Sequence, residues 1–236
     1  MNVAIRFILI CAVLFVLLEL KNRKERPYYQ QLETANAELL EGCFVNDPVN
    51  HRRFMRALAQ FANGRISTAQ ALFISTSQRV KTSEDKAACL YMASKALSQN
   101  GNDAQALVYA ETALQLQPGR KHLRMEHARI LARNRNERAL EEFRSLVADF
   151  PTDAQVYHAF GNACILLENP TEAIIQLETA LKNDPDCSGT RGLLMLANAL
   201  LGDRETASMW CEEAAKHGED VDQLRKIMEN ILNKEK

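Results

Sequence analysis

The stretch from Ala154 to Cys187 reads AQVYHAFGNACILLENPTEAIIQLETALKNDPDC and has the pattern of two consecutive helices. Apolar and small residues recur at helical spacing in its first half, at Tyr157, Phe160, Gly161 and Cys164. The same spacing returns in its second half, at Ala173, Leu177 and Ala180. Pro185 then ends the second helix, because proline cannot continue one. The stretch therefore predicts a helix, a turn and a second helix.

The pattern recurs along the chain with a period of 33 or 34 residues. Its small residues keep the same register in four copies, at Ala106, Ala139, Ala173 and Ala207. The composition agrees, because 9 glycines, 6 prolines and 6% aromatic residues leave little material for an all-β fold. We therefore expect an all-α protein built from a repeated helix pair.

These residues resemble the tetratricopeptide repeat family, whose pattern is an aromatic residue, Leu-Gly and Tyr, followed by Ala, Phe, Ala and Pro. The resemblance covers residues 50–221 and implies an α-solenoid of antiparallel helix pairs. The expected repeats are residues 50–83, 87–119, 120–153, 154–187 and 188–221. The aromatic residue of the pattern is present as Tyr157, but other repeats have Leu90, Leu123 and Arg191 there. Residues 50–83 fit either a divergent repeat or a plain helical hairpin.

Two segments are expected to flank the solenoid. Residues 222–236 carry one apolar stripe, which predicts a capping helix over the last repeat. The members of this stripe are Leu224, Met228, Ile231 and Leu232. Residues 21–49 are expected to form a basic flank and a juxtamembrane helix, from Tyr28 to Gly42, that acts as a linker. A spacer is favoured over a coiled-coil dimer, because two heptads are too few to specify one.

Residues 1–20 are expected to form a transmembrane anchor. The run from Val3 to Leu20 is apolar apart from Arg6 and Glu19. As a helix it spans about 27 Å, which is enough for a thin bilayer core. A cleavable signal peptide is the alternative, and it is disfavoured because no small-x-small cleavage site follows the run.

The charges beside this run predict the side of the membrane on which the repeats lie. Four basic residues follow it, whereas only Arg6 and the α-amino group lie on the other side. They are Lys21, Arg23, Lys24 and Arg26. The positive-inside rule then places the repeats in the cytoplasm. Five cysteines after the anchor, without a C-x-x-C pair, suit a reducing compartment. The plan is similar to anchored repeat scaffolds of the bacterial inner membrane, which is the expected location, and it also fits mitochondrial outer-membrane receptors.

The sequence lacks the common catalytic and metal-binding motifs, including the phosphate-binding loop, the G-x-S-x-G elbow and H-E-x-x-H. His122 and His127 lie five residues apart on one expected helix, which is a poor spacing for a shared metal. Cys164 and Cys211 fall on positions that the repeat buries, so we expect core thiols rather than nucleophiles. The sequence therefore predicts a protein that is not an enzyme and holds neither metal nor cofactor.

The resemblance also implies a partner-binding groove. In the family, peptides lie on the concave surface of the solenoid and contact outward positions of each first helix. Carried over residue by residue, these positions give the candidate site Tyr91, Lys95, Lys121, Arg124, His158 and Asn162. The set is mildly basic and suits a carboxylate or an acidic peptide. It matches the carboxylate clamp of chaperone-binding members only in part, because two of the clamp's residue pairs are missing.

The segment Arg120–Arg138 is the densest basic stretch of the chain. It is interpreted first as a solvated helix face and second as a contact for anionic lipid or an acidic protein. The net charge of −1 gives no footprint for non-specific nucleic-acid binding, so no nucleic-acid partner is expected.

The leading functional hypothesis is a membrane-anchored, non-enzymatic scaffold that holds a protein or peptide partner at the membrane surface. Its role would be the assembly or regulation of a membrane-associated complex. The alternative is an extracytoplasmic, periplasmic assembly chaperone for secreted proteins, apocytochromes, or pilus and secretion subunits. An enzyme whose site escapes motif analysis is the weakest hypothesis, because no acid, base and nucleophile occur at suggestive spacing.

Overall fold

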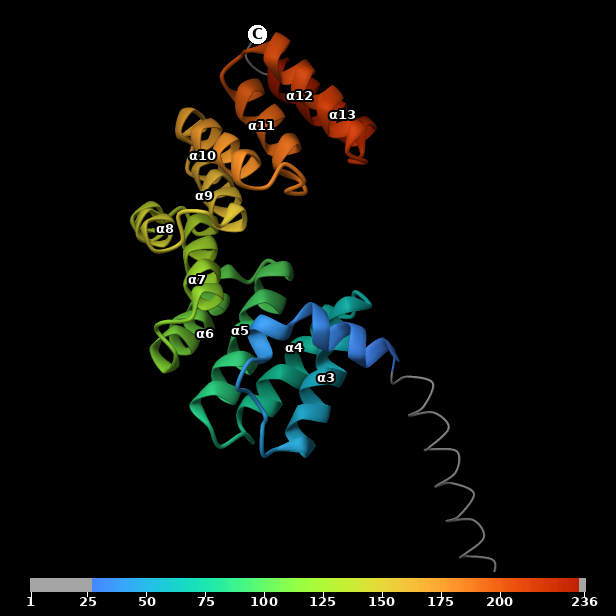
Figure 1. Cartoon of the computed structure of the whole chain (residues 1–236), viewed down its shortest axis with the longest axis vertical. Helices are drawn as coiled ribbons and strands as arrows, with labels where there is room; N and C mark the ends of the chain where they lie inside the picture. The colour runs from blue at the N-terminus through green and yellow to red at the C-terminus, as the bar shows by residue number, and fades with distance from the viewer. Residues whose placement is uncertain (1–26, 234–236) are drawn as a thin grey trace, which may run out of the picture. The chain divides into compact units, whose positions relative to one another are not determined.

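The computed structural model describes residues 27–233, whose regular secondary structure is helical, with no β-strand in that range (Figure 1). These residues divide into two compact units, whose boundary lies between Asn100 and Gly101. The expected anchor at residues 1–20 lies outside the described residues, as does the beginning of the basic flank. Within the described range, no helix is both long and apolar enough to cross a bilayer.

The first unit consists of a short N-terminal helical segment and three longer helices. Residues 27–35 are helical and are followed by α2 (Ala37–Leu40), α3 (Pro48–Ala62), α4 (Ile66–Ser77) and α5 (Ser83–Gln99). Helix α3 packs against α4, and α4 packs against α5. Gly64 lies in the tight turn between α3 and α4 with φ +72°, a conformation that glycine adopts without strain. Residues 48–77 thus form a helical hairpin.

Two boundaries in this unit differ from those expected. The expected helix from Tyr28 to Gly42 is interrupted at Asn36, whose φ and ψ of −117° and 21° are not helical. Helix α5 begins at Ser83, one turn before the expected start of its repeat at residue 87. The reason is a helix cap, because the Thr82 hydroxyl accepts the backbone N–H of Asp85 at 3.1 Å.

Phe44 fastens the N-terminal segment to the first unit. Its backbone N–H donates to Oδ1 of Asp85 on α5 at 2.5 Å. Its ring is buried with its centroid 5.1 Å from that of Phe54, which in turn lies 5.3 Å from Phe73. Because Leu39 of α2 is also buried, the linker ends inside the core of this unit.

The second unit consists of a single helix, three helix pairs and a last single helix. Its helices are α6 (Asp103–Leu116), α7 (Lys121–Arg133), α8 (Arg138–Asp149), α9 (Ala154–Leu166), α10 (Pro170–Asn183), α11 (Thr190–Leu200), α12 (Arg204–Lys216) and α13 (Val221–Leu232). Helices α7 and α8, α9 and α10, and α11 and α12 pack as hairpins. The first helices of these pairs follow one another, with α7 against α9 and α9 against α11. The predicted fold of antiparallel helix pairs is confirmed for this unit.

Small residues bring the two helices of each pair close together. Ala139, Ala173 and Ala207, at equivalent positions, are fully buried. Gly161 on α9 is the tightest point, because a Cβ there would lie 2.5 Å from Cγ of Leu177 on α10. The space left between pairs is filled by larger side chains, including the stacked rings of Phe143 and Phe160, whose centroids are 5.5 Å apart.

Helix α13 covers the far side of the last pair by packing against α11 and α12. Met228 and Leu232 are buried there with Met195 and Cys211, while Leu224 packs at the edge of this cluster. The N-terminus of α13 is capped by the carboxylate of Asp220, which accepts the backbone N–H of Gln223 at 3.1 Å. The remaining side chains of α13 are mostly polar and exposed, so the helix ends the apolar core.

Candidate partner-binding surface

The six candidate site residues fall on three helices and in both units. Tyr91 and Lys95 lie on α5 of the first unit, where the ammonium of Lys95 is 5.4 Å from the centroid of the Tyr91 ring. Lys121 and Arg124 lie on α7 of the second unit, and His158 and Asn162 lie on α9. Because α7 packs against α9, the second unit carries four of the six residues on neighbouring helices.

The two candidate cations of α7 take part in ion pairs within the unit. Nζ of Lys121 lies 2.8 Å from Oδ2 of Asp153, the residue that caps α9. Nη1 of Arg124 lies 2.7 Å from Oδ2 of Asp149, and its Nη2 donates to Oγ of Ser145 at 3.0 Å. A ligand carboxylate would therefore have to compete with an aspartate already in place.

His158 is a partly buried, hydrogen-bonded side chain on α9. Its Nδ1 lies 2.9 Å from Oγ1 of Thr190, the first residue of α11. Burial lowers the pKa of His158, and the positive charge of Arg129 lowers it further. The imidazole is therefore neutral at pH 7 and offers a ligand a hydrogen bond rather than a positive charge.

Arg129 and Asn162 complete the polar surface beside His158. Asn162 lies one turn after His158 on α9, is partly exposed and has no hydrogen-bond partner among the described residues. The guanidinium of Arg129 on α7 has only a weak pairing, with its Nη1 4.0 Å from Oε2 of Glu126. We call Arg129, His158 and Asn162 the α7–α9 cluster. The candidates expected from the sequence do not include Arg129, because it does not occupy one of the outward positions that the family pattern defines.

Two further basic residues of the stretch Arg120–Arg138, Arg133 and Arg135, also form ion pairs within the second unit. Nε of Arg133 lies 2.9 Å from Oδ1 of Asp103 on α6. Nη1 of Arg135 lies 3.1 Å from Oε1 of Glu168 and also donates to the backbone carbonyl of Leu166 at the end of α9. These pairings favour a structural role for the stretch over a lipid contact.

The histidines, acidic residues and cysteines of the described range were compared with the requirements of a metal site and of a reactive thiol. No three His, Cys, Asp or Glu side chains in the range 27–233 are grouped so that they could hold a metal ion. Cys89, Cys164, Cys187 and Cys211 are buried, and Cys43 is half-buried. Burial raises the pKa of Cys164 to about 12, so at pH 7 this thiol is protonated and a poor nucleophile.

Helix pairs stacked through small residues, with polar side chains left on neighbouring first helices, define a helical-repeat protein of the protein-interaction class. A sequence model of the tetratricopeptide repeat matches residues 48–190. The chain belongs to the tetratricopeptide repeat family. Its domains are typically non-enzymatic scaffolds for protein interaction.

Solved structures of repeat proteins share this fold. A thermophilic tetratricopeptide repeat protein of Thermus thermophilus is 19% identical with a TM-score of 0.65, and the match covers 78% of this chain and 99% of that one. MamA of Desulfovibrio magneticus, from residue 41 to its end, is 19% identical with a TM-score of 0.54, covering 71% and 94%. At these identities the likeness is one of fold. None of the curated proteins compared with the chain matches it in sequence.

Proposed function

We propose that the chain is a membrane-anchored, non-enzymatic scaffold that binds a protein or peptide partner through the α7–α9 cluster. The observation that carries the proposal is the placement of Arg129, His158 and Asn162 on two adjacent first helices. These three polar groups take no part in the close ion pairs of the unit, so each can form a further hydrogen bond. In a family of protein-interaction scaffolds, such groups are the natural points of contact for a partner.

The chemistry of the cluster favours a partner segment that carries a carboxylate. Arg129 supplies the positive charge, and Asn162 supplies an amide that can donate to the same group. His158 is neutral and would hydrogen-bond a neighbouring backbone or side-chain group. An acidic side chain or a C-terminal carboxylate meets these requirements. Lys121 and Arg124 contribute less, because Asp153 and Asp149 already neutralise them.

The membrane anchor is proposed from the sequence alone. The apolar run from Val3 to Leu20 would hold the repeats at a membrane, and the basic residues 21–26 after it favour the cytoplasmic face. Tethering raises the effective concentration of a partner that is itself at the membrane, so weak contacts at the cluster would suffice. Assembly or regulation of a complex in a bacterial inner membrane is the role that fits this arrangement.

Site-specific photo-crosslinking in cells tests the cluster. A benzophenone amino acid replaces Asn162 in one variant and Glu178, exposed on α10, in a matched control. We expect a crosslinked partner from position 162 and little from position 178. Arg129→Glu should reduce the yield at least tenfold, whereas Lys182→Glu, an equal change of charge on α10, should not. Equal yields from the two positions would count against the cluster as the binding site.

Labelling of an added cysteine tests the topology separately. In a variant with Cys11→Ser and Cys43→Ser, the other four cysteines are buried, so a cysteine added after Lys236 becomes the main target of a maleimide. Protection from an impermeant maleimide in intact cells is expected for a cytoplasmic scaffold. Labelling from outside would instead favour the extracytoplasmic assembly chaperone. The same variant without the added cysteine is the control for background labelling.

A further inference from the structure

The outer face of α3 in the first unit carries one valine and three arginines. Val49, Arg52, Arg53 and Arg56 are exposed. Their spacing of i, i+3, i+4 and i+7 places them on one side of the helix. The other side of α3 is buried in the core of the unit, with Phe54 at its centre. We call Val49, Arg52, Arg53 and Arg56 the α3 face.

Among the described residues, none of the three arginines of the α3 face forms an ion pair with a carboxylate. Nε of Arg52 donates to the backbone carbonyl of Pro48 at 3.2 Å. Nη1 of Arg53 donates to Oδ1 of Asn50 at 2.9 Å. Like charges three or four residues apart destabilise a helix. The positive charge of the α3 face therefore adds nothing to the stability of α3.

One acidic residue, Asp47, lies at the N-terminus of α3, and it is engaged as the helix cap. Its carboxylate accepts the backbone N–H of Asn50 at 3.0 Å and the side-chain amide of Asn50 at 2.6 Å. These hydrogen bonds lower the pKa of Asp47, and the charges of Lys81 and Arg53 lower it further. The amide of Asn50 also donates to the backbone carbonyl of Arg79 at 3.4 Å. Two more exposed cations, Lys81 and Arg79, thus adjoin the α3 face.

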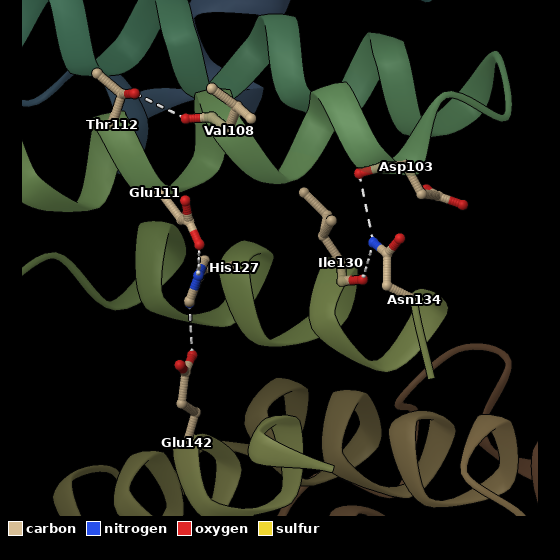
Figure 2. A network of polar contacts seen from close by, with 8 residues as sticks. All are labelled: Asp103, Val108, Glu111, Thr112, His127, Ile130, Asn134 and Glu142. Atoms are coloured by element: carbon tan, nitrogen blue, oxygen red, sulfur yellow. Dashed lines mark hydrogen bonds and ion pairs between the residues drawn. The ribbon is translucent and has the colours of Figure 1, made fainter. Parts of the chain in front are cut away.

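The polar side chains of α7 in the second unit show the opposite arrangement. Figure 2 shows His127 of α7 between Glu111 of α6 and Glu142 of α8. Near the end of α7, Nε of Arg133 lies 2.9 Å from Oδ1 of Asp103. Basic groups that join helices of this fold meet acidic groups on neighbouring helices. The arginines of the α3 face have no such partner in their unit, so an anion from outside it would complete them.

Exposed apolar residues beside these arginines favour a lipid surface as that anion. Val45, just before α3, is 76% exposed, and Val49 is 51% exposed. A phospholipid surface accommodates both kinds of side chain, because its phosphates bind arginine and its headgroup boundary accepts apolar groups. A purely acidic peptide would bind the arginines and leave the two valines in water.

The chain also ties the start of α3 to a segment close to the apolar run. Oε1 of Glu33 lies 3.5 Å from Nε2 of His51 on α3. Glu33 follows Leu20, the end of the run, by 13 residues. Even a fully extended chain of that length spans only about 45 Å. The α3 face can therefore reach the surface of a membrane in which the run is inserted.

We propose that the α3 face docks on the headgroups of anionic phospholipids. Arg52, Arg53 and Arg56 bind the phosphates, and Val49 enters the boundary between headgroups and acyl chains. The inference rests on the proposed anchor, which brings the first unit to the bilayer, but it concerns a surface separate from the α7–α9 cluster. Docking gives the scaffold a second attachment to the membrane, whose strength depends on lipid charge and falls with salt.

The test places the full chain in lipid nanodiscs with an environment-sensitive fluorophore at position 49. A variant with Cys11→Ser, Cys43→Ser and Val49→Cys carries the fluorophore, because the other four cysteines are buried. One set of discs contains phosphatidylcholine alone, and the other contains about 30% phosphatidylglycerol as the anionic lipid. We expect a blue-shifted, stronger emission in the anionic discs only, and its loss in about 1 M salt.

Matched variants show whether the response belongs to the α3 face. The same fluorophore at Val108→Cys, an exposed valine of α6, should not respond to lipid charge. Arg52→Glu with Arg53→Glu should lower the ratio of docked to undocked chains by about 25-fold or more, since each basic residue near an anionic surface contributes about fivefold. Lys182→Glu with Arg204→Glu makes an equal change of charge on exposed residues of the second unit and should keep the response.

The outcomes separate the α3 face from the anchor. A chain that co-elutes with both kinds of disc, with equal emission at position 49, keeps the anchor and overturns the α3 face. Co-elution and a blue shift with anionic discs alone would support the α3 face and count against the anchor. Equal responses at positions 49 and 108 would also overturn the α3 face. A blue shift with added polyglutamate, and none with anionic lipid, would assign the face to an acidic protein instead.

Discussion

The carboxylate of Asp153 caps the N-terminus of α9 and also forms an ion pair with Lys121 on α7, the first helix of the preceding pair. Its Oδ1 accepts the backbone N–H of Gln155 at 3.0 Å and of Val156 at 3.3 Å, and so caps α9. Its Oδ2 lies 2.8 Å from Nζ of Lys121 on α7. One side chain therefore fixes the start of a helix and its position against the preceding first helix.

We expect Asp153→Ala to destabilise the second unit by about 1–2 kcal/mol, because it removes a helix cap together with an ion pair. Lys121→Ala should cost less than about 1 kcal/mol, because a partly exposed ion pair contributes little and the cap remains. Urea unfolding followed by Trp210 fluorescence measures both. A larger loss for Lys121→Ala than for Asp153→Ala would show that the cap is not the main contribution.

Gly161→Ala should destabilise the second unit by about 1–3 kcal/mol, because the added methyl group would collide with Leu177. Gly119→Ala is the matched control, since no atom lies within 4 Å of the Cβ that it adds. The control should unfold within about 0.5 kcal/mol of the unaltered chain. Thermal or urea unfolding of the two variants distinguishes them, and equal stabilities would mean that the helices separate at little cost.

Thiol reactivity should separate Cys43 from the other four described cysteines. In a Cys11→Ser variant at pH 8, we expect Cys43 to react first with a thiol reagent, because it is only half-buried. Burial raises the pKa of Cys89, Cys164 and Cys211, so these thiols should react only when the chain unfolds. Mass spectrometry of the labelled peptides identifies the sites. Early labelling of Cys164 in the folded chain would contradict the packing of α9.

Removal of α13 should expose the last helix pair. A chain that ends at Gly218 lacks Met228 and Leu232, whose burial we expect to contribute about 3 kcal/mol or more. We expect a lower urea midpoint and faster labelling of Cys211, which those residues cover. Removal of residues 234–236 alone is the control and should change neither quantity. Unchanged protection of Cys211 after the longer truncation would mean that α13 does not cover the pair.

The sequence was sufficient to predict the helix pairs, because their small residues must recur at fixed spacing for two helices to pack closely. Ala139, Ala173 and Ala207 show this directly, since each is fully buried at an equivalent position. Helix ends were less predictable. The cap at Thr82 and the break at Asn36 depend on single side-chain and backbone conformations that leave no periodic trace.

The candidate site was harder to predict than the fold. Lys121 and Arg124 sit on expected first-helix positions, but their aspartate partners lie 32 and 25 residues further along the chain. Only the folded structure shows that these charges meet. Beyond the effect of burial, Arg129 lowers the pKa of His158. Residue spacing alone does not reveal this interaction between two helices.

The attachment at Phe44 has a mechanical consequence. Residues before Ala37 connect to the first unit through the segment that Leu39 and Phe44 hold in its core. They also contact it directly, because Oε1 of Glu33 lies 3.5 Å from Nε2 of His51 on α3. Tension on that segment would load the bond from the Phe44 backbone to Asp85 before it reached the start of α3. Part of the load would thus pass into α5 rather than into the start of α3.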